Sequence, residues 1–125
     1  MANPNIVNVA TINGNANYGA VGTGSPDTQI LSNAASSGKI FKVNSLYIAN
    51  IDGTNSVDVS VRVYTQAGLA GTANAILSTV AVAADSTLVV VTKDTALYIL
   101  ENSSIGVFAS ASGDATFHCS WDEIS

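Results

Sequence analysis

Apolar and polar residues alternate most clearly between positions 44 and 65, which read NSLYIANIDGTNSVDVSVRVYT. From Val57 to Val63 every second residue is valine, and the positions between them, from Asp58 to Tyr64, carry other side chains. A period of two places these two sets on opposite faces of a strand, and valine packs well on a pleated surface. The pattern predicts a half-buried strand, because one face of a helix does not repeat with that period.

Residues 52–55, Asp-Gly-Thr-Asn, separate this strand from the apolar run before it. Asp-Gly between two apolar runs is a strong hairpin signal, since glycine accepts the positive φ of a tight turn. We therefore expect residues 44–65 to form two antiparallel strands joined by a hairpin. The run at residues 39–50 is apolar in both phases, so both of its faces are expected to be partly covered. One phase holds Phe41, Val43, Tyr47 and Ala49, and the other holds Ile40, Leu46 and Ile48.

The second half of the chain continues in short apolar runs separated by turn residues. Further strands are expected at residues 75–82, 87–92, 96–100, 105–112 and 115–121. The run TLVVVT at 87–92 is typical of a strand buried on both sides, and residues 66–72 predict a flexible loop of small residues. In the last strand one face is expected to carry Ala115, Phe117, Cys119 and Trp121, and the other Thr116, His118 and Ser120.

The number and spacing of these runs predict an all-β, antiparallel β-sandwich. There are about eight or nine short strands, and turn signals recur about every 8 to 12 residues. Spacing alone leaves a jelly roll and an immunoglobulin-like sandwich both open, although the strand count favours the jelly roll. At 125 residues the chain is expected to be a single domain, with residues 1–38 forming an N-terminal arm and edge strands and residues 39–125 the sandwich core.

The N-terminal region is rich in Asn, Gly, Ser and Ala, and its short apolar pieces need a partner. Ile6, Val7, Val9 and Ile12 have too few apolar neighbours nearby to form a core, which favours an arm that reaches a neighbouring subunit over a loosely held terminus. The opening MANPNIVNVA has neither the positive start nor the apolar stretch of a secretory signal, and no run is long enough to span a membrane. We expect a protein made in the cytoplasm, with no membrane partner.

Low charge is the most unusual feature of the composition. Only 10% of residues are charged, against about 25% in ordinary soluble domains, while 47% are hydrophobic. An uncharged polar surface suits repeated protein–protein contact, because edge strands without Lys or Glu normally need covering. The net charge is −5, and the four cations, Lys39, Lys42, Arg62 and Lys93, are scattered, so nucleic-acid binding is not expected.

No residue pattern predicts catalysis, a cofactor or a metal site. His118, the single histidine, shares a strand face with Ser120, and Asp122 follows, but side chains two residues apart on a strand leave it in parallel rather than converge as a triad requires. Cys119 is expected to be a structural core residue that cannot form an intrachain disulfide. The carboxylates lie mostly in separate turns, which leaves calcium as a weak alternative: Asp52, Asp58, Asp85, Asp94, Asp114, Asp122 and Glu123.

Two further groups of residues have weak functional signals. Gly19, Gly22 and Gly24 precede no helix, so they lack the helix N-terminus of a phosphate-binding loop. The four tyrosines, Tyr18, Tyr47, Tyr64 and Tyr98, could stack on sugars if they gathered on one face. Tyr64 is the best exposed candidate by strand phase, although a position in the core or at its rim is the simpler interpretation.

The C-terminal third, ADSTLVVVTKDTALYILENSSIGVFASASGDATFHCSWDEIS at residues 84–125, resembles a family of small virion proteins of tailed phages, especially phages of marine cyanobacteria. The similarity lies in the order of STLVV, a KD turn, an apolar strand, a polar turn, an alternating strand ending in ASA, a GD turn and a closing EIS. The opening MANPNIVNVA and the block LSNAASSGKIFKVNSLYIANIDGTN are similar to the same family. Two departures are the turn at residues 101–104, which is less acidic and lacks glycine, and residues 117–119, Phe-His-Cys, in place of valines.

The resemblance implies a β-sandwich structural protein of the virion, assembled in the host cytoplasm. The expected role is a capsid decoration or cement protein on the outer surface of the head, which contacts the major capsid protein or another virion protein and associates with itself, most simply as a homotrimer. A ring component of the neck or tail is the alternative within the same class. A carbohydrate-binding β-sandwich module is the alternative from another class, and an enzyme is not expected.

Overall fold

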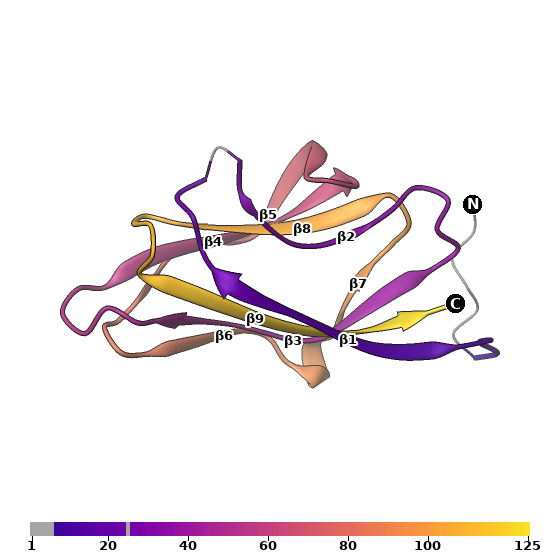
Figure 1. Ribbon diagram of the computed structural model, residues 1–125, viewed down its shortest axis with the longest axis horizontal. Coiled ribbons are helices and arrows are strands. Elements are labelled where there is room, and N and C mark those ends of the chain that lie inside the picture. The colour runs from indigo at the N-terminus through magenta and orange to yellow at the C-terminus, as the bar shows by residue number, and fades with distance from the viewer. Residues whose placement is uncertain (1–6, 25) are drawn as a thin grey trace.

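The computed structural model describes residues 7–24 and 26–125 as two antiparallel β-sheets packed face to face (Figure 1). The strands are β1 (Ile12–Ala20), β2 (Thr28–Asn33), β3 (Ile40–Asn50), β4 (Val57–Gln66), β5 (Ala70–Val82), β6 (Thr87–Val91), β7 (Leu97–Ile99), β8 (Ser103–Ala109) and β9 (Ala115–Ile124). A single 3-10 turn, Lys93–Thr95, precedes β7 in the described part of the chain. The predicted all-β sandwich is confirmed.

The strand order is that of a jelly roll. One sheet has the order β1-β9-β3-β6, with β7 also pairing with β3, and the other has the order β2-β8-β4-β5. Strands pair from the two ends of the chain inward, β1 with β9, β2 with β8, β3 with β6 and β4 with β5, as in one long hairpin that has been rolled up. Pairing of β9 with β3 and of β8 with β4 closes the roll. An immunoglobulin-like arrangement would keep β1 and β2 in one sheet, and here they lie in different sheets.

The two inner faces form one apolar core. Val57, Val59 and Val61 of β4 are at most 1% exposed, as the alternating pattern predicted. The inner face of β9 consists of the predicted Ala115, Phe117, Cys119 and Trp121, all buried. Val21, Ile30 and Leu31, from the region before β3, belong to the same core. β2 is therefore an integral strand at the edge of its sheet, and β1 is attached to its sheet by pairing with β9 along its whole length.

The predicted hairpin between β3 and β4 is wrong, because the two strands lie in different sheets. Residues 51–56 cross from one layer to the other, and the Asn50 side chain ties the crossing by donating to the carbonyls of Asn55 and Val82. The Asp52 carboxylate accepts from the amides of Thr54 and Asn55 and forms the turn. Gly53 has no positive φ; instead, a Cβ at this position would lie 3.3 Å from a carboxylate oxygen of Asp85.

The phase of β3 also differs from the prediction. A bulge between Val43 and Ser45 shifts the register, so Phe41 and Val43 before it and Leu46 and Ile48 after it all face the core. Because a bulge inserts one extra residue, it transfers the inward phase from odd to even positions. This inversion leaves Tyr47 and Ala49 on the outer face of the sheet.

Residues 66–72 are not a long loop. β4 continues to Gln66 and β5 begins at Ala70, so the connection is a tight turn in which Gly68 and Leu69 adopt positive φ. Ile76 of β5 is 44% exposed. The prediction that β6 is buried on both sides is also wrong: β6 is an edge strand, and Val89 is 55% exposed.

The N-terminal end of the described chain lies beside the C-terminus. The amides of Ala10 and Thr11 donate to the carbonyl of Ser125, and the amide of Ser125 donates to the carbonyl of Thr11. These bonds extend the β1–β9 pairing beyond the pair Ile12 and Ile124. Val7 and Ile12 are exposed. Ile6 and the residues before it lie outside the described residues, so the N-terminal arm stays a prediction.

Candidate assembly edges and an aromatic surface row

The strands at the edges of the two sheets carry no charged residue in the part of the chain that the structure describes. These strands are β1 on one side of its sheet, β6 and β7 on the other, and β2 and β5 in the second sheet. The charged strand residues, Lys42, Asp58, Arg62, Asp122 and Glu123, all lie on the interior strands β3, β4 and β9. Soluble β-proteins ordinarily place charges or proline at their edges to prevent pairing with other chains. This protein has the opposite arrangement.

The edge at β1 is partly closed by its own side chains. The Asn15 and Asn17 side-chain oxygens accept from the backbone amides of Ala16 and Tyr18, which face away from β9. The Asn17 side-chain amide also donates to the carbonyl of Ile30 on β2, 2.7 Å away, and so links the two sheets along this side of the sandwich. Asparagine thus satisfies groups that would otherwise be available to another strand.

The edge at β5 is more open. This strand has 13 residues, AGTANAILSTVAV, with neither charge nor proline. Within the described residues, the side chains that accept from its backbone amides are Thr65 and Ser60 of β4, on the paired side of the strand. Its free side therefore presents backbone donors and acceptors without a side-chain cap. Three register shifts between β4 and β5 add local twist, so a strand that pairs here must match that twist.

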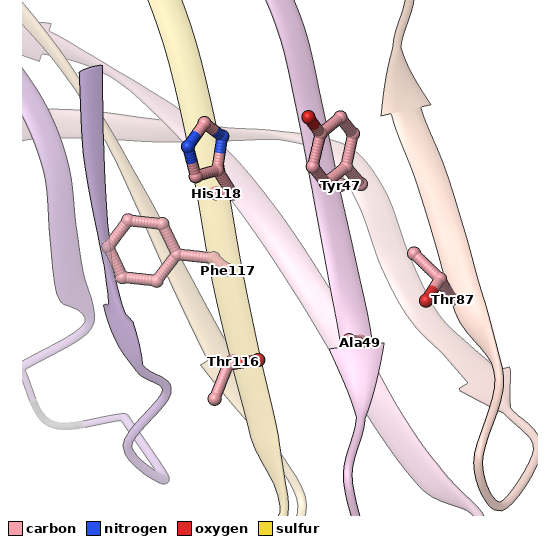
Figure 2. Close-up of a pocket in the computed structure, with 6 residues that line it drawn as sticks. All are labelled: Tyr47, Ala49, Thr87, Thr116, Phe117 and His118. Atoms are coloured by element: carbon pink, nitrogen blue, oxygen red, sulfur yellow. The ribbon is translucent and has the colours of Figure 1, made fainter.

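An aromatic row crosses the outer face of the other sheet. Tyr18 of β1, His118 of β9 and Tyr47 of β3 are direct cross-strand partners. The ring centroids of Tyr18 and His118 are 5.6 Å apart with an angle of 8° between planes, and those of Tyr47 and His118 are 5.5 Å apart with an angle of 10°. Figure 2 shows the His118 and Tyr47 rings side by side rather than one over the other, so this pair is offset and part of each ring face stays uncovered. Tyr18 is 70% exposed and Tyr47 38%.

A trough of about 350 Å³ lies beside this row. Its lining consists of Tyr47, Ala49, Thr87, Thr116, Phe117 and His118 (Figure 2). Ala49 pairs with both Thr116 and Thr87 across neighbouring strands, so the floor is made of small side chains and two hydroxyls. Figure 2 shows His118 and Tyr47 side by side at one end of this floor. The trough has an aromatic wall, a low floor and no carboxylate or ammonium group in its lining.

A second polar cluster lies on the outer face of the β2-β8-β4-β5 sheet. The Arg62 guanidinium donates through Nε to Asp27 Oδ2 at 2.9 Å and through Nη2 to Oδ1, and the Tyr64 hydroxyl donates to Oδ2 at 2.7 Å. Burial alone raises the pKa of Asp27, but the hydrogen bonds from Arg62 and Tyr64 and the guanidinium charge outweigh it and hold that pKa below its ordinary value. The Arg62 guanidinium also lies 4.7 Å from the centre of the Phe108 ring. This cluster fastens the β1–β2 connection to the sheet.

The remaining candidate residues of the sequence are dispersed. His118, Ser120 and Asp122 occupy successive outward positions of β9, and no hydrogen bond joins them in the described part of the chain. Cys119 is fully buried, and this burial raises the pKa of its thiol to about 12. Among the described residues no three His, Cys, Asp or Glu side chains gather into a metal-binding group. Of the three glycines in this segment, Gly24 has a positive φ and packs against the Phe108 ring, whereas Gly19 lies within β1.

The structure divides the four tyrosines into different environments. Tyr18 and Tyr47 belong to the aromatic row, whereas Tyr98 is 41% exposed on β7 and separate from it. Tyr64 is only 9% exposed and is held by Asp27, in agreement with a position at the rim of the core. No sequence pattern indicates that Tyr18, Tyr47 and His118 meet, because their pairing depends on the register of strands far apart in the chain. The contact of Asp27 with Arg62 and Tyr64 has no sequence signal, because Asp27 stands within a turn sequence.

None of the described residues belongs to a helix with the length and apolar character that crossing a membrane would take.

Comparison with known proteins finds a likeness in fold. No protein-family model matches the chain, and no curated protein matches it. A solved structure from Bacillus, described by the words "endospore appendages form a novel family of disulfide-linked pili", is similar with a TM-score of 0.52 and 18% sequence identity. The similarity covers 92% of this chain and 88% of that chain. At this level of identity the likeness shows that the two share a β-sandwich fold.

Proposed function

We propose that this protein is a structural subunit of a phage virion, most specifically a decoration or cement protein on the outer surface of the head. In this role many copies stabilise the shell through small repeated contacts with one another and with the major capsid protein. Multivalent attachment makes weak single contacts sufficient, because each bound contact raises the effective concentration of the next. The resemblance of residues 84–125 to small virion proteins of tailed phages supports this assignment.

The observation that carries the proposal is the absence of charge from the edge strands. In an isolated protein, an uncharged 13-residue edge such as β5 is a liability, because it can pair with any exposed strand. In a subunit that is always assembled, the same edge is covered. The interior strands β3, β4 and β9 do contain charged residues, so strands of this chain can hold charge. Charged residues are therefore missing specifically from the edge strands.

The fold is compatible with polymeric assemblies. The similar Bacillus structure comes from pili, which are polymers of subunits. Covalent linkage by disulfides is not available to this chain in its folded state, because its one cysteine, Cys119, is fully buried. We therefore expect copies of this protein to associate by strand pairing and surface contact. The resemblance to small phage virion proteins favours a closed homotrimer.

The charge of the protein favours an outside position on the particle. Its net charge of −5 repels packaged nucleic acid, and its four cations are dispersed over the chain. A ring component of the neck or tail would satisfy the same edge and charge arguments. The two positions differ in where the protein is found, and that difference can be observed directly.

The experiment is to locate the protein on particles of the tailed phage whose genome encodes it. Purified virions are labelled with a gold-conjugated antibody raised against the recombinant protein and are imaged by electron microscopy. Labelling spread over the head supports the decoration role, and labelling confined to the neck or tail supports the ring role instead. Purified virions that lack the protein, by both labelling and mass spectrometry, would refute a virion function.

A further inference from the structure

We infer that the aromatic row of Tyr18, His118 and Tyr47, together with the trough beside it, is a binding site for a neutral saccharide. The inference concerns side chains on the outer face of the β1-β9-β3-β6 sheet, whereas the proposed function rests on the unpaired backbone edges of the sheets. A structural subunit with such a site would add a weak attachment to surface glycans in every copy.

The aromatic row supplies the surface that a sugar ring needs. Pyranose rings bind proteins by laying their C–H groups on the face of an aromatic ring, where the π-electrons are concentrated. Tyr18 and Tyr47 are 70% and 38% exposed, and the offset between the rings leaves part of each face open. Neighbouring rings follow one another at 5.6 and 5.5 Å, a spacing comparable with one unit of a linear oligosaccharide. The row therefore fits a short chain of sugars better than a single one.

The trough supplies the polar part of the site. Thr87 and Thr116 place hydroxyl groups in its lining, and hydroxyls can both donate to and accept from the hydroxyls of a sugar. The volume of about 350 Å³ lies within the range of small-ligand sites. Ala49 and the outward-facing Ala20, which also pairs with Thr116, keep the floor low, so a ring lying flat meets no bulky side chain.

Charge decides which ligand fits this surface. The lining contains no Lys or Arg that could hold a phosphate, a sulfate or a carboxylate. A nucleobase could also stack on the row, but its phosphate would meet a chain of net charge −5. An uncharged sugar meets no such electrostatic repulsion. The alternative occupant, a second copy of this chain, would cover the row and make it unavailable in the assembled protein.

The chain offers a matched control for the test. Tyr98 is 41% exposed, close to the 38% of Tyr47, but it lies on β7 outside the row. The full-length wild type, Tyr47→Ala and Tyr98→Ala are applied to an array of neutral mono- and oligosaccharides that includes glucose, galactose and N-acetylglucosamine oligomers. Affinity for the best probe is then measured by titration calorimetry, and the native mass of each variant by light scattering.

We expect saturable binding of at least one neutral oligosaccharide at about millimolar affinity. Tyr47→Ala should weaken this binding by about tenfold or more, and Tyr98→Ala should leave it unchanged. The native masses of all three proteins should be equal. The inference is overturned if no neutral saccharide binds, if Tyr98→Ala weakens binding as much as Tyr47→Ala, or if Tyr47→Ala changes the native mass, since that result would make the row an interface between copies. None of these outcomes depends on where the protein lies on a virion.

Discussion

Removing the guanidinium of Arg62 tests how the β1–β2 connection is held to the sheet. In Arg62→Met the aliphatic part of the side chain is largely kept, but Asp27 loses the two hydrogen bonds from Nε and Nη2 and keeps the one from Tyr64. The Asp27 side chain has no exposed surface, so its carboxylate would be left charged and only partly compensated. Breaking a buried ion pair in this way costs about 3–5 kcal/mol.

Solvent reduces that figure here. The Arg62 side chain is 34% exposed, so its charge is partly screened by water. We therefore expect Arg62→Met to lower the free energy of unfolding by about 2–3 kcal/mol at pH 7. Tyr64→Phe removes one hydrogen bond to the same carboxylate and should cost about 1–2 kcal/mol. Urea unfolding followed by the fluorescence of Trp121, the only tryptophan, measures both values.

The pH dependence provides an independent check of the same cluster. The pKa of Asp27 is lowered from 3.8 in the folded protein, so the unfolded chain binds this proton more readily than the folded one. The stability that Asp27 contributes is present above pH 3.8 and is lost as the pH falls through the lower folded value. The difference between wild type and Arg62→Met should therefore shrink between pH 7 and pH 3. A difference below about 0.5 kcal/mol at pH 7, within the range of ordinary surface substitutions, or one that does not change with pH, would refute the reasoning.

Two further predictions concern buried positions on β8 and β9. A Cβ at position 106 would lie 3.0 Å from both Asp27 Cβ and Leu69 Cδ2, so Gly106→Ala should lower the free energy of unfolding by about 1–2 kcal/mol. Gly14→Ala is its control, because a Cβ there meets nothing within 4 Å, and equal urea midpoints for the two variants would contradict the packing around Gly106. Cys119 is fully buried and the pKa of its thiol is raised to about 12, so the folded protein should not react with a thiol reagent at pH 8, whereas the protein in concentrated urea should react completely. Rapid reaction of the folded protein would show that β9 opens readily.

The positions of the strands were easier to predict from sequence than the pairing of the strands within the sheets. Alternation identified β4 and β9 and the inward face of each, because a period of two is a local property that the chain itself displays. The hairpin between β3 and β4 was wrong because Asp52-Gly53 indicates a turn, but nothing local states whether the strands on either side share a sheet. In this jelly roll they do not, and the side chain of Asn50 supports the crossing instead.

A bulge accounts for the disagreement in the phase of β3. One extra residue near Ser45 moves Tyr47 to the outer face and Leu46 to the core. The aromatic row could not be predicted from sequence, because it requires the bulge in β3 and the registers of β1 and β9 at the same time. The uncharged edges were more accessible: low charge was visible in the composition, and only the identity of the edge strands required the structure.

The central claim, that uncharged edge strands hold copies of this protein together, is tested most directly by native mass. Wild type, Ile76→Lys and Ser112→Lys are compared by light scattering after size exclusion over a range of concentrations. Ile76 is exposed on the free edge strand β5, whereas Ser112 lies in the exposed turn before β9, so both variants gain the same charge and only one gains it at an edge. We predict a trimer for wild type and Ser112→Lys, and a monomer with an unchanged fold for Ile76→Lys. A wild type that stays monomeric at every concentration, or an Ile76→Lys variant with the mass of the wild type, would contradict the claim.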